Sequence, residues 1–158
     1  MNKINKNPGE VAVSSLDALS EFERKGVILL RHADLFFTEN NADRIPLEIR
    51  ELFTNKKYCA QISDLITILA THYRRPIVRH QPYCNRVGAD ENVFSNLIMF
   101  SGSGQVEDAM LLGTLLVKRR MVAELVHKAA LVADIFDKEL NENEFLHRVE
   151  IKKNHQLH

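Results

Sequence analysis

The residues of this sequence that are best suited to chemistry lie in one stretch, from Thr71 to Glu91. It contains four arginines, two histidines, one cysteine and two tyrosines, and it ends on adjacent carboxylates. The part between positions 75 and 89 includes two prolines and a glycine and is long for a connection between two helices. Long connections in compact domains are often functional. Three kinds of functional site are possible in this stretch.

Anion recognition is the function that this composition favours. Guanidinium groups bind carboxylates and phosphates through paired hydrogen bonds. No acidic residue lies between positions 74 and 86, so the positive charge must be neutralised from outside this span or by a partner. We therefore expect the loop to bind an acidic partner or a small anionic ligand. The residues concerned are Arg74, Arg75, Arg79, Arg86 and Tyr83, with Tyr73 as a second stacking group.

The alternative for these arginines is structural, because they can pair with the protein's own carboxylates, including Asp90 and Glu91. Replacing Arg75 and Arg79 with glutamine distinguishes the two interpretations. Exposed ion pairs contribute only about 0–1 kcal/mol to folding. A loss of function with an intact helical core would therefore indicate a ligand, and unfolding would indicate a structural loop.

A metal site is the second possibility, built from His72, His80 and Cys84, with Asp90 or Glu91 in addition. Imidazole, thiolate and carboxylate are zinc ligands, and three protein ligands would leave an open position. The sequence has neither a Cys-x-x-Cys nor a His-Glu-x-x-His motif, which are the more specific signals. A metal-binding protein or metal-dependent enzyme is thus the alternative function, with zinc as its metal, and otherwise we expect no cofactor.

Nucleophilic catalysis by Cys84 is the third possibility. A thiolate is stabilised by nearby cations, which His80 or an arginine would supply. Asp90 would oppose that effect, and no third group is placed to orient a base. The sequence favours an unreactive cysteine.

Composition places limits on the whole molecule. The 158 residues suit one domain, and 45% hydrophobic with 27% charged residues is typical of a globular protein. Lysine and arginine balance aspartate and glutamate at 21 each, so no net charge attracts nucleic acid or an anionic membrane. The apolar runs are too short to span a bilayer, and no signal peptide is visible. Two cysteines make no disulfide framework, and we expect a cytoplasmic protein.

Apolar residues at helical spacing predict an all-α single domain of six or seven helices. We expect residues 1–13 and 153–158 to be flexible tails on a helical domain of residues 14–152. The first helix should begin at Ser14 or Ser15, with Asp17 completing a capping box. Val27–Leu30 resembles a buried strand, but helix is favoured because no partner strand is visible. The expected helices cover residues 14–37, 46–53, 58–74, 90–100, 105–117, 120–140 and 142–152, with Asp90 as the N-cap of the fourth.

The longest helical pattern runs from Gln105 to Leu140. Its apolar stripes are interrupted at Lys118–Arg120, which predicts two helices joined by a tight basic corner, with one long bent helix as the alternative. The second helix is thin, and such a helix lies in the middle of a bundle or in a subunit interface. Four alanines keep this helix thin, namely Ala123, Ala129, Ala130 and Ala133. We therefore expect a homodimer that uses the alanine-rich face around Ala123, Ala130 and Ala133.

A DNA-binding helix-turn-helix fits the sequence poorly. The only placement pairs residues 46–53 with residues 58–73, and the turn between them lacks the usual glycine. The second helix is also poor in positive charge. We expect a small regulatory or adaptor protein that binds a protein or a small anion rather than catalysing a reaction, and nucleic acid is not an expected partner.

Overall fold

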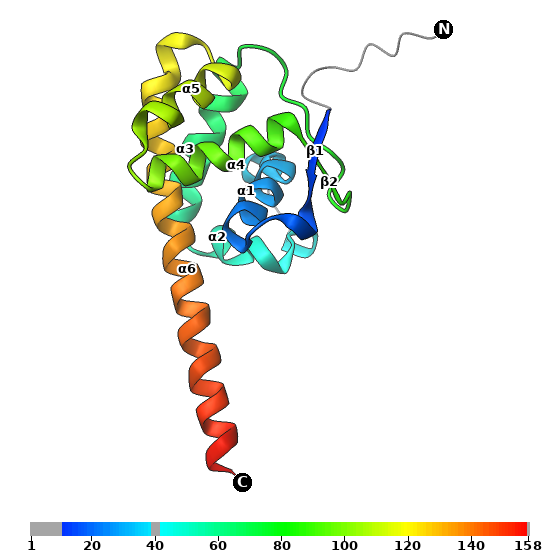
Figure 1. Cartoon of the computed structure of the whole chain (residues 1–158), viewed down its shortest axis with the longest axis vertical. Coiled ribbons are helices and arrows are strands. Elements are labelled where there is room, and N and C mark those ends of the chain that lie inside the picture. The colour runs from blue at the N-terminus through cyan, green and yellow to red at the C-terminus, as the bar shows by residue number, and fades with distance from the viewer. Residues whose placement is uncertain (1–10, 39–41, 158) are drawn as a thin grey trace, which may run out of the picture.

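The computed structural model describes residues 11–38 and 42–157 (Figure 1). The prediction of a mostly helical single domain is confirmed, with the addition of a small two-stranded sheet. The helices are α1 (Glu21–Arg31), α2 (Arg50–Thr54), α3 (Lys56–His72), α4 (Ala89–Gly102), α5 (Val106–Leu116) and α6 (Val122–Gln156), and the strands are β1 (Ala12–Ser15) and β2 (Arg86–Gly88). Among the described residues, no helix combines the length and apolarity needed to cross a membrane.

Helix α4 lies at the centre of the core and packs against α1, α5 and α6. Its side chains Phe94, Leu97 and Ile98 are fully buried, as is Phe136 of α6. Burying one such side chain contributes about 1.5–3 kcal/mol. The packing of α4 therefore holds the first and last thirds of the chain together.

The alanine-rich face of α6 is covered within the chain only in part, because Ala123 is exposed and Ala130 is half-buried. Ala129 and Ala133 are buried, and a Cβ atom added at Gly102 of α4 would lie only 2.4 Å from the Cβ of Ala133. The small residues thus let two backbones of one chain approach closely. This makes α6 the predicted thin central helix, but Ala133 is not available for the expected subunit interface.

Helix α1 begins at a capping box that the sequence interpretation misplaced. The hydroxyl of Ser20 accepts a hydrogen bond from the backbone N–H of Glu23 at 3.2 Å, and the Glu23 carboxylate accepts one from the backbone N–H of Ser20 at 2.9 Å. Ser14 and Ser15, the expected start, belong to β1 instead. The preference for helix over strand at Val27–Leu30 is confirmed.

Strand β1 pairs with β2 in antiparallel register, with Ala12 opposite Gly88 and Ser15 opposite Arg86. This small sheet was not visible in the sequence, because strands of three and four residues are too short to show a period. β1 includes positions 12 and 13 of the predicted N-terminal tail, and residues 1–10 lie outside the described residues. The sheet attaches β1 to the arginine-rich loop.

The predicted corner between α5 and α6 is confirmed. Helix α5 ends at Leu116, a 3-10 turn covers Arg119–Met121, and α6 begins at Val122. The backbone N–H of Lys118 donates to the carbonyl of His72 at 2.9 Å, so the corner is attached to the end of α3.

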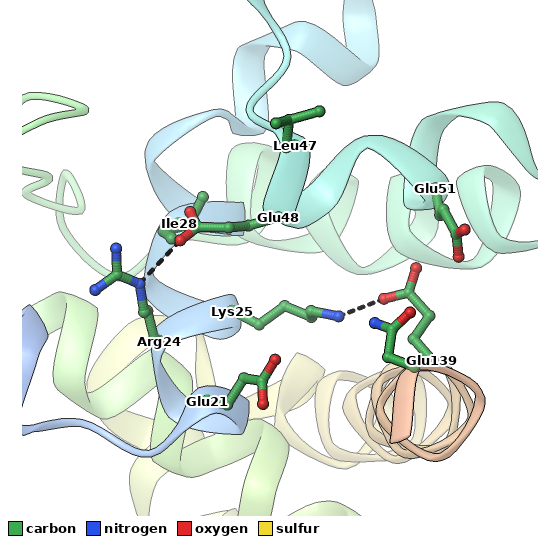
Figure 2. A pocket seen from close by; sticks show the side chains of 9 residues that line it. Glu21, Arg24, Lys25, Ile28, Leu47, Glu48, Glu51 and Glu139 are labelled. Atoms are coloured by element: carbon green, nitrogen blue, oxygen red, sulfur yellow. Dashed lines mark hydrogen bonds and ion pairs between the residues drawn. The ribbon is translucent and has the colours of Figure 1, made fainter. Parts of the chain in front are cut away.

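The separate helix expected at 142–152 is instead a continuation of α6, which also includes positions 153–156 of the predicted tail. The chain has no proline or glycine after position 113 to end the helix there. A buried ion pair fixes α6 where it leaves the other helices, with Lys25 Nζ of α1 2.5 Å from Glu139 Oε2 (Figure 2). Beyond that point α6 projects away from the rest of the molecule (Figure 1).

Candidate functional site

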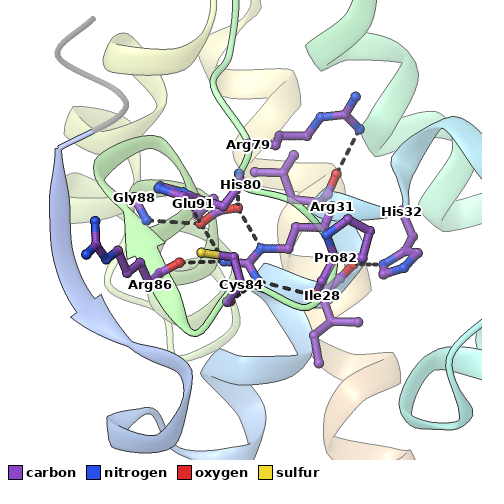
Figure 3. A network of polar contacts seen from close by, with 11 residues as sticks. Ile28, Arg31, His32, Arg79, His80, Pro82, Cys84, Arg86, Gly88 and Glu91 are labelled. Atoms are coloured by element: carbon purple, nitrogen blue, oxygen red, sulfur yellow. Dashed lines mark hydrogen bonds and ion pairs between the residues drawn. The ribbon is translucent and has the colours of Figure 1, made fainter. Parts of the chain in front are cut away.

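The loop between α3 and α4, residues 73–88, is held against α1 by a buried ion pair. Arg31 ends α1 and Glu91 lies in the first turn of α4, and both side chains are fully buried. Arg31 Nε donates to Glu91 Oε1 at 2.7 Å, and Arg31 Nη2 donates to Glu91 Oε2 at 3.0 Å. Figure 3 shows this pair at the centre of a network of polar contacts. Two-point contact of this kind fixes orientation as well as distance.

The remaining donors of Arg31 bind the backbone of the loop. Nη1 donates to the carbonyls of Cys84 at 2.6 Å and Pro82 at 3.4 Å, and Nη2 donates to the carbonyl of Arg86 at 2.7 Å. All five N–H groups of the guanidinium therefore have acceptors. One buried side chain thus determines the path of the loop from position 82 to position 86.

Glu91 collects donors from the same loop. Its carboxylate accepts hydrogen bonds from the backbone N–H of His80 at 2.8 Å and of Gly88 at 3.0 Å, and His80 Nδ1 lies 3.2 Å away. Burial alone would raise the pKa of Glu91, but the hydrogen bonds from Arg31, Gly88 and His80 outweigh it and hold the pKa below the ordinary value of 4.5. The carboxylate is therefore charged at neutral pH.

A second ion pair attaches the beginning of the loop. Arg75 Nη1 and Nη2 donate to the two carboxylate oxygens of Asp90 at 2.8 and 2.7 Å, and Asp90 also accepts from the backbone N–H of Val78 at 2.8 Å. The hydrogen bond to Asp90 raises the pKa of Arg75. Asp90 was expected to cap α4, but the N-cap is Gly88. Asp90 is buried and binds the loop instead, so that expectation was wrong.

The four predicted arginines do not converge on one ligand. Arg75 binds Asp90, and this pairing with the protein's own carboxylate is what the structural alternative predicted. Arg74 donates to the carbonyl of Thr114 on α5 at 3.2 Å. Within residues 11–38 and 42–157, the guanidinium of Arg86 has no hydrogen bond or ion pair. The side chain of Tyr83 is 95% exposed and Tyr73 is also exposed.

Arg79 is held loosely at the end of α1. Its Nη1 donates to the carbonyl of Leu30 at 3.1 Å and lies 3.8 Å from Asp34 Oδ1. Both side chains are more than one third exposed, at 39% for Arg79 and 58% for Asp34. Arg79 is therefore not neutralised by a buried carboxylate, in contrast to Arg75.

The proposed metal ligands are not gathered into a site. His80 faces Glu91, Cys84 is a half-buried free thiol, and His72 ends α3. Among the residues that the structure describes, no three His, Cys, Asp or Glu side chains are grouped so that they could hold a metal ion. His72, His80 and Cys84 therefore do not form the three-ligand set of the metal alternative.

Two hollows flank the loop and share Asp34 and Arg79. The first has a volume of about 430 Å³ and an apolar lining contributed by α1, the 3-10 turn Ala33–Phe37, α3 and the loop. This lining includes Leu30, Phe37, Ile66, Leu69, Tyr73 and Ile77. The second, of about 570 Å³, is polar and lined in part by His32, Arg44, His80 and Tyr83. Because Asp34 and Arg79 line both hollows, this ion pair stands between an apolar space and a polar one.

Sequence reasoning missed Arg31, the residue that organises the loop. A signal was present, because Arg31 follows Val27 by one helical turn and so lies on the apolar side of α1. A charged residue on a buried helix face requires a partner. No local pattern identifies that partner as Glu91, which is 60 positions away.

No protein-family model matches this chain, and neither curated proteins nor solved structures give a match. The function must therefore be inferred from the loop and its two hollows.

Proposed function

We propose that the protein binds a small amphipathic anion, with the apolar part of the ligand in the first hollow and its negative group on Arg79. The observation that carries this proposal is a groove of about 430 Å³ with an apolar lining and one available guanidinium group. Ligand sites typically have volumes of 300–1,000 Å³, apolar walls and a few polar groups that orient the ligand. We call this space the Arg79 groove.

Arg79 is better suited than the other arginines to bind the negative group of the ligand. Its ion pair with Asp34 is long and exposed, and exposed ion pairs contribute only about 0–1 kcal/mol to stability. A ligand carboxylate can therefore replace Asp34 at little cost. Arg31 and Arg75 are held by two-point contacts with their own carboxylates, and an incoming anion would have to break those contacts.

Ligand binding without turnover suits a small regulatory or adaptor protein. In this proposal the ligand contacts Arg79, which is attached to α1 through the carbonyl of Leu30 and whose neighbour His80 is attached to α4 through Glu91. The two free cysteines, Cys59 and Cys84, support a reducing cytoplasmic setting. An acidic protein partner would instead use the exposed side of the loop around Arg86.

The test is a comparison of decanoate with decanol, which share an apolar chain and differ in the charged group. We expect isothermal titration calorimetry to detect decanoate binding that weakens by about tenfold to a hundredfold in Arg79→Gln, as for loss of a hydrogen bond to a charged group. Arg86→Gln is the matched control and should bind as the wild type does. Equal binding of the acid and the alcohol, or equal losses in the two variants, would overturn the proposal.

The apolar part of the Arg79 groove is tested separately on α3. Ala70 lines the groove, and Ala60 is exposed on the same helix but outside it. We expect Ala70→Trp to fill the groove and abolish decanoate binding, whereas Ala60→Trp should not change it. If Ala70→Trp binds decanoate normally, the ligand occupies another surface.

A further inference from the structure

Helix α6 extends well beyond the helices that cover its first half. We call residues 141–156 the α6 extension. Every residue from Asn141 to Arg148 is exposed, as are all those that follow except Val149, which is half-buried. Figure 1 shows the extension projecting clear of the other elements. At a rise of 1.5 Å per residue it is about 24 Å long. Most helical stability in proteins comes from packing of an apolar face against other elements.

One side of the α6 extension carries the features of a helix-helix contact. Glu142, Leu146, Val149 and Lys153 are separated by four, three and four residues, which is the spacing of a seam between two helices. Leu146 is 59% exposed, and Phe145 beside it is 67% exposed. The seam therefore has an apolar centre between an acidic end and a basic end.

The charges of the extension are divided between its two halves. Residues 141–147 contain two glutamates and no lysine or arginine, which gives −2. Residues 148–156 contain three basic residues and one glutamate, which gives +3 − 1 = +2. A parallel second copy would place like charges together, and an antiparallel copy places opposite charges together. The total is zero, so a strongly acidic or basic partner gains nothing from this surface.

We propose that two copies of this chain associate through their α6 extensions as an antiparallel helix pair. A two-fold axis between positions 147 and 148 places Leu146 against Val149 of the second copy and Glu142 against Lys153 of the second copy. Two-fold symmetry forms each of these contacts twice. The buried pair of Lys25 and Glu139 holds α6 at the base of the extension, so its direction is set before association.

The experiment measures the mass of the full-length chain by sedimentation equilibrium from about 1 to 500 µM. The wild type should rise from 18.1 kDa toward twice that mass. Glu142→Lys or Lys153→Glu should each weaken association by about tenfold or more, because each reversal puts like charges together at two symmetric places. The double variant Glu142→Lys/Lys153→Glu should recover the affinity of the wild type, because it restores both pairs in exchanged positions.

Asp137→Lys is the matched control, because Asp137 is exposed on α6 before the extension begins. It should associate as the wild type does, and circular dichroism should show wild-type helix content in every variant. A wild type that stays at 18.1 kDa up to 500 µM would overturn the proposal. So would single reversals without effect, or a double variant that fails to recover association.

Discussion

Arg31 and Glu91 show why a charged residue can be essential to a fold without meeting a ligand. Their side chains are fully buried, and together they accept or donate hydrogen bonds along most of the loop from position 80 to position 88. A buried pair of this kind need not add net stability, but removal of one partner leaves a buried charge without compensation. The polar groups of the loop therefore serve largely to hold the loop in place.

Replacing Arg31 with methionine should destabilise the protein strongly. The change leaves the Glu91 carboxylate buried without its cation, which typically costs about 3–5 kcal/mol. Arg24→Met is the matched control, because the side chains of Arg24 and its partner Glu48 are both more than one third exposed, at 37% and 47%, and such ion pairs contribute only about 0–1 kcal/mol. Urea unfolding followed by circular dichroism gives both free energies. Similar losses for the two variants would mean that Arg31 does not organise the loop.

Acidification should weaken the fold through Glu91. The folded-state pKa of Glu91 lies below the ordinary value of 4.5, so the unfolded chain binds a proton more readily. The contribution to stability is complete above pH 4.5 and is lost as the pH falls through the folded-state pKa. We expect the free energy of unfolding to decrease below about pH 4.5, and Glu91→Gln to remove part of that decrease. Glu144→Gln on the exposed α6 extension should retain it, and identical pH profiles for the two variants would contradict the assignment.

At the scale of elements, helices with a periodic apolar pattern were predictable from the sequence. Contacts between residues far apart in the sequence were not. The break at Lys118–Arg120 was visible because charge interrupts two apolar stripes. Strands β1 and β2 were not visible in the sequence, because strands of four and three residues are too short to show an alternating pattern. The role of Asp90 was misjudged because an aspartate at the start of a helical pattern resembles an N-cap until the loop that it binds is known. Whether the loop binds a metal or an anion depends on which of its residues lie close together in the folded chain. Their separation in the sequence does not determine this proximity.

The attachment of α6 to α1 supplies a prediction at this scale. Lys25 and Glu139 are both buried, so Lys25→Met alone should cost about 3–5 kcal/mol. The double variant Lys25→Met/Glu139→Leu removes both charges and should recover most of that loss, because apolar side chains can replace a buried ion pair. Chemical denaturation of the two variants provides the comparison. If the double variant is no more stable than the single one, the loss in Lys25→Met does not come from an uncompensated charge on Glu139.

At the scale of the whole molecule, the two proposals use separate surfaces. The Arg79 groove is formed by α1, the 3-10 turn Ala33–Phe37, α3 and the loop, whereas the proposed self-association uses the α6 extension. Neither surface depends on net charge, which is zero, and each combines apolar side chains with a small number of placed charges. Loss of one function should therefore leave the other intact, and Arg79→Gln should associate as the wild type does.

NMR titration of isotope-labelled protein with decanoate shows whether an amphipathic anion occupies the Arg79 groove. We predict that the largest shifts occur at the methyl groups of Ile66, Leu69 and Ile77 and at the Nε–H of Arg79, with saturation at one ligand per chain. Methyl groups at the centre of α4, such as those of Leu97, should not move. Shifts spread over the α6 extension, or no saturable shifts in the groove, would mean that the anion does not bind in the Arg79 groove.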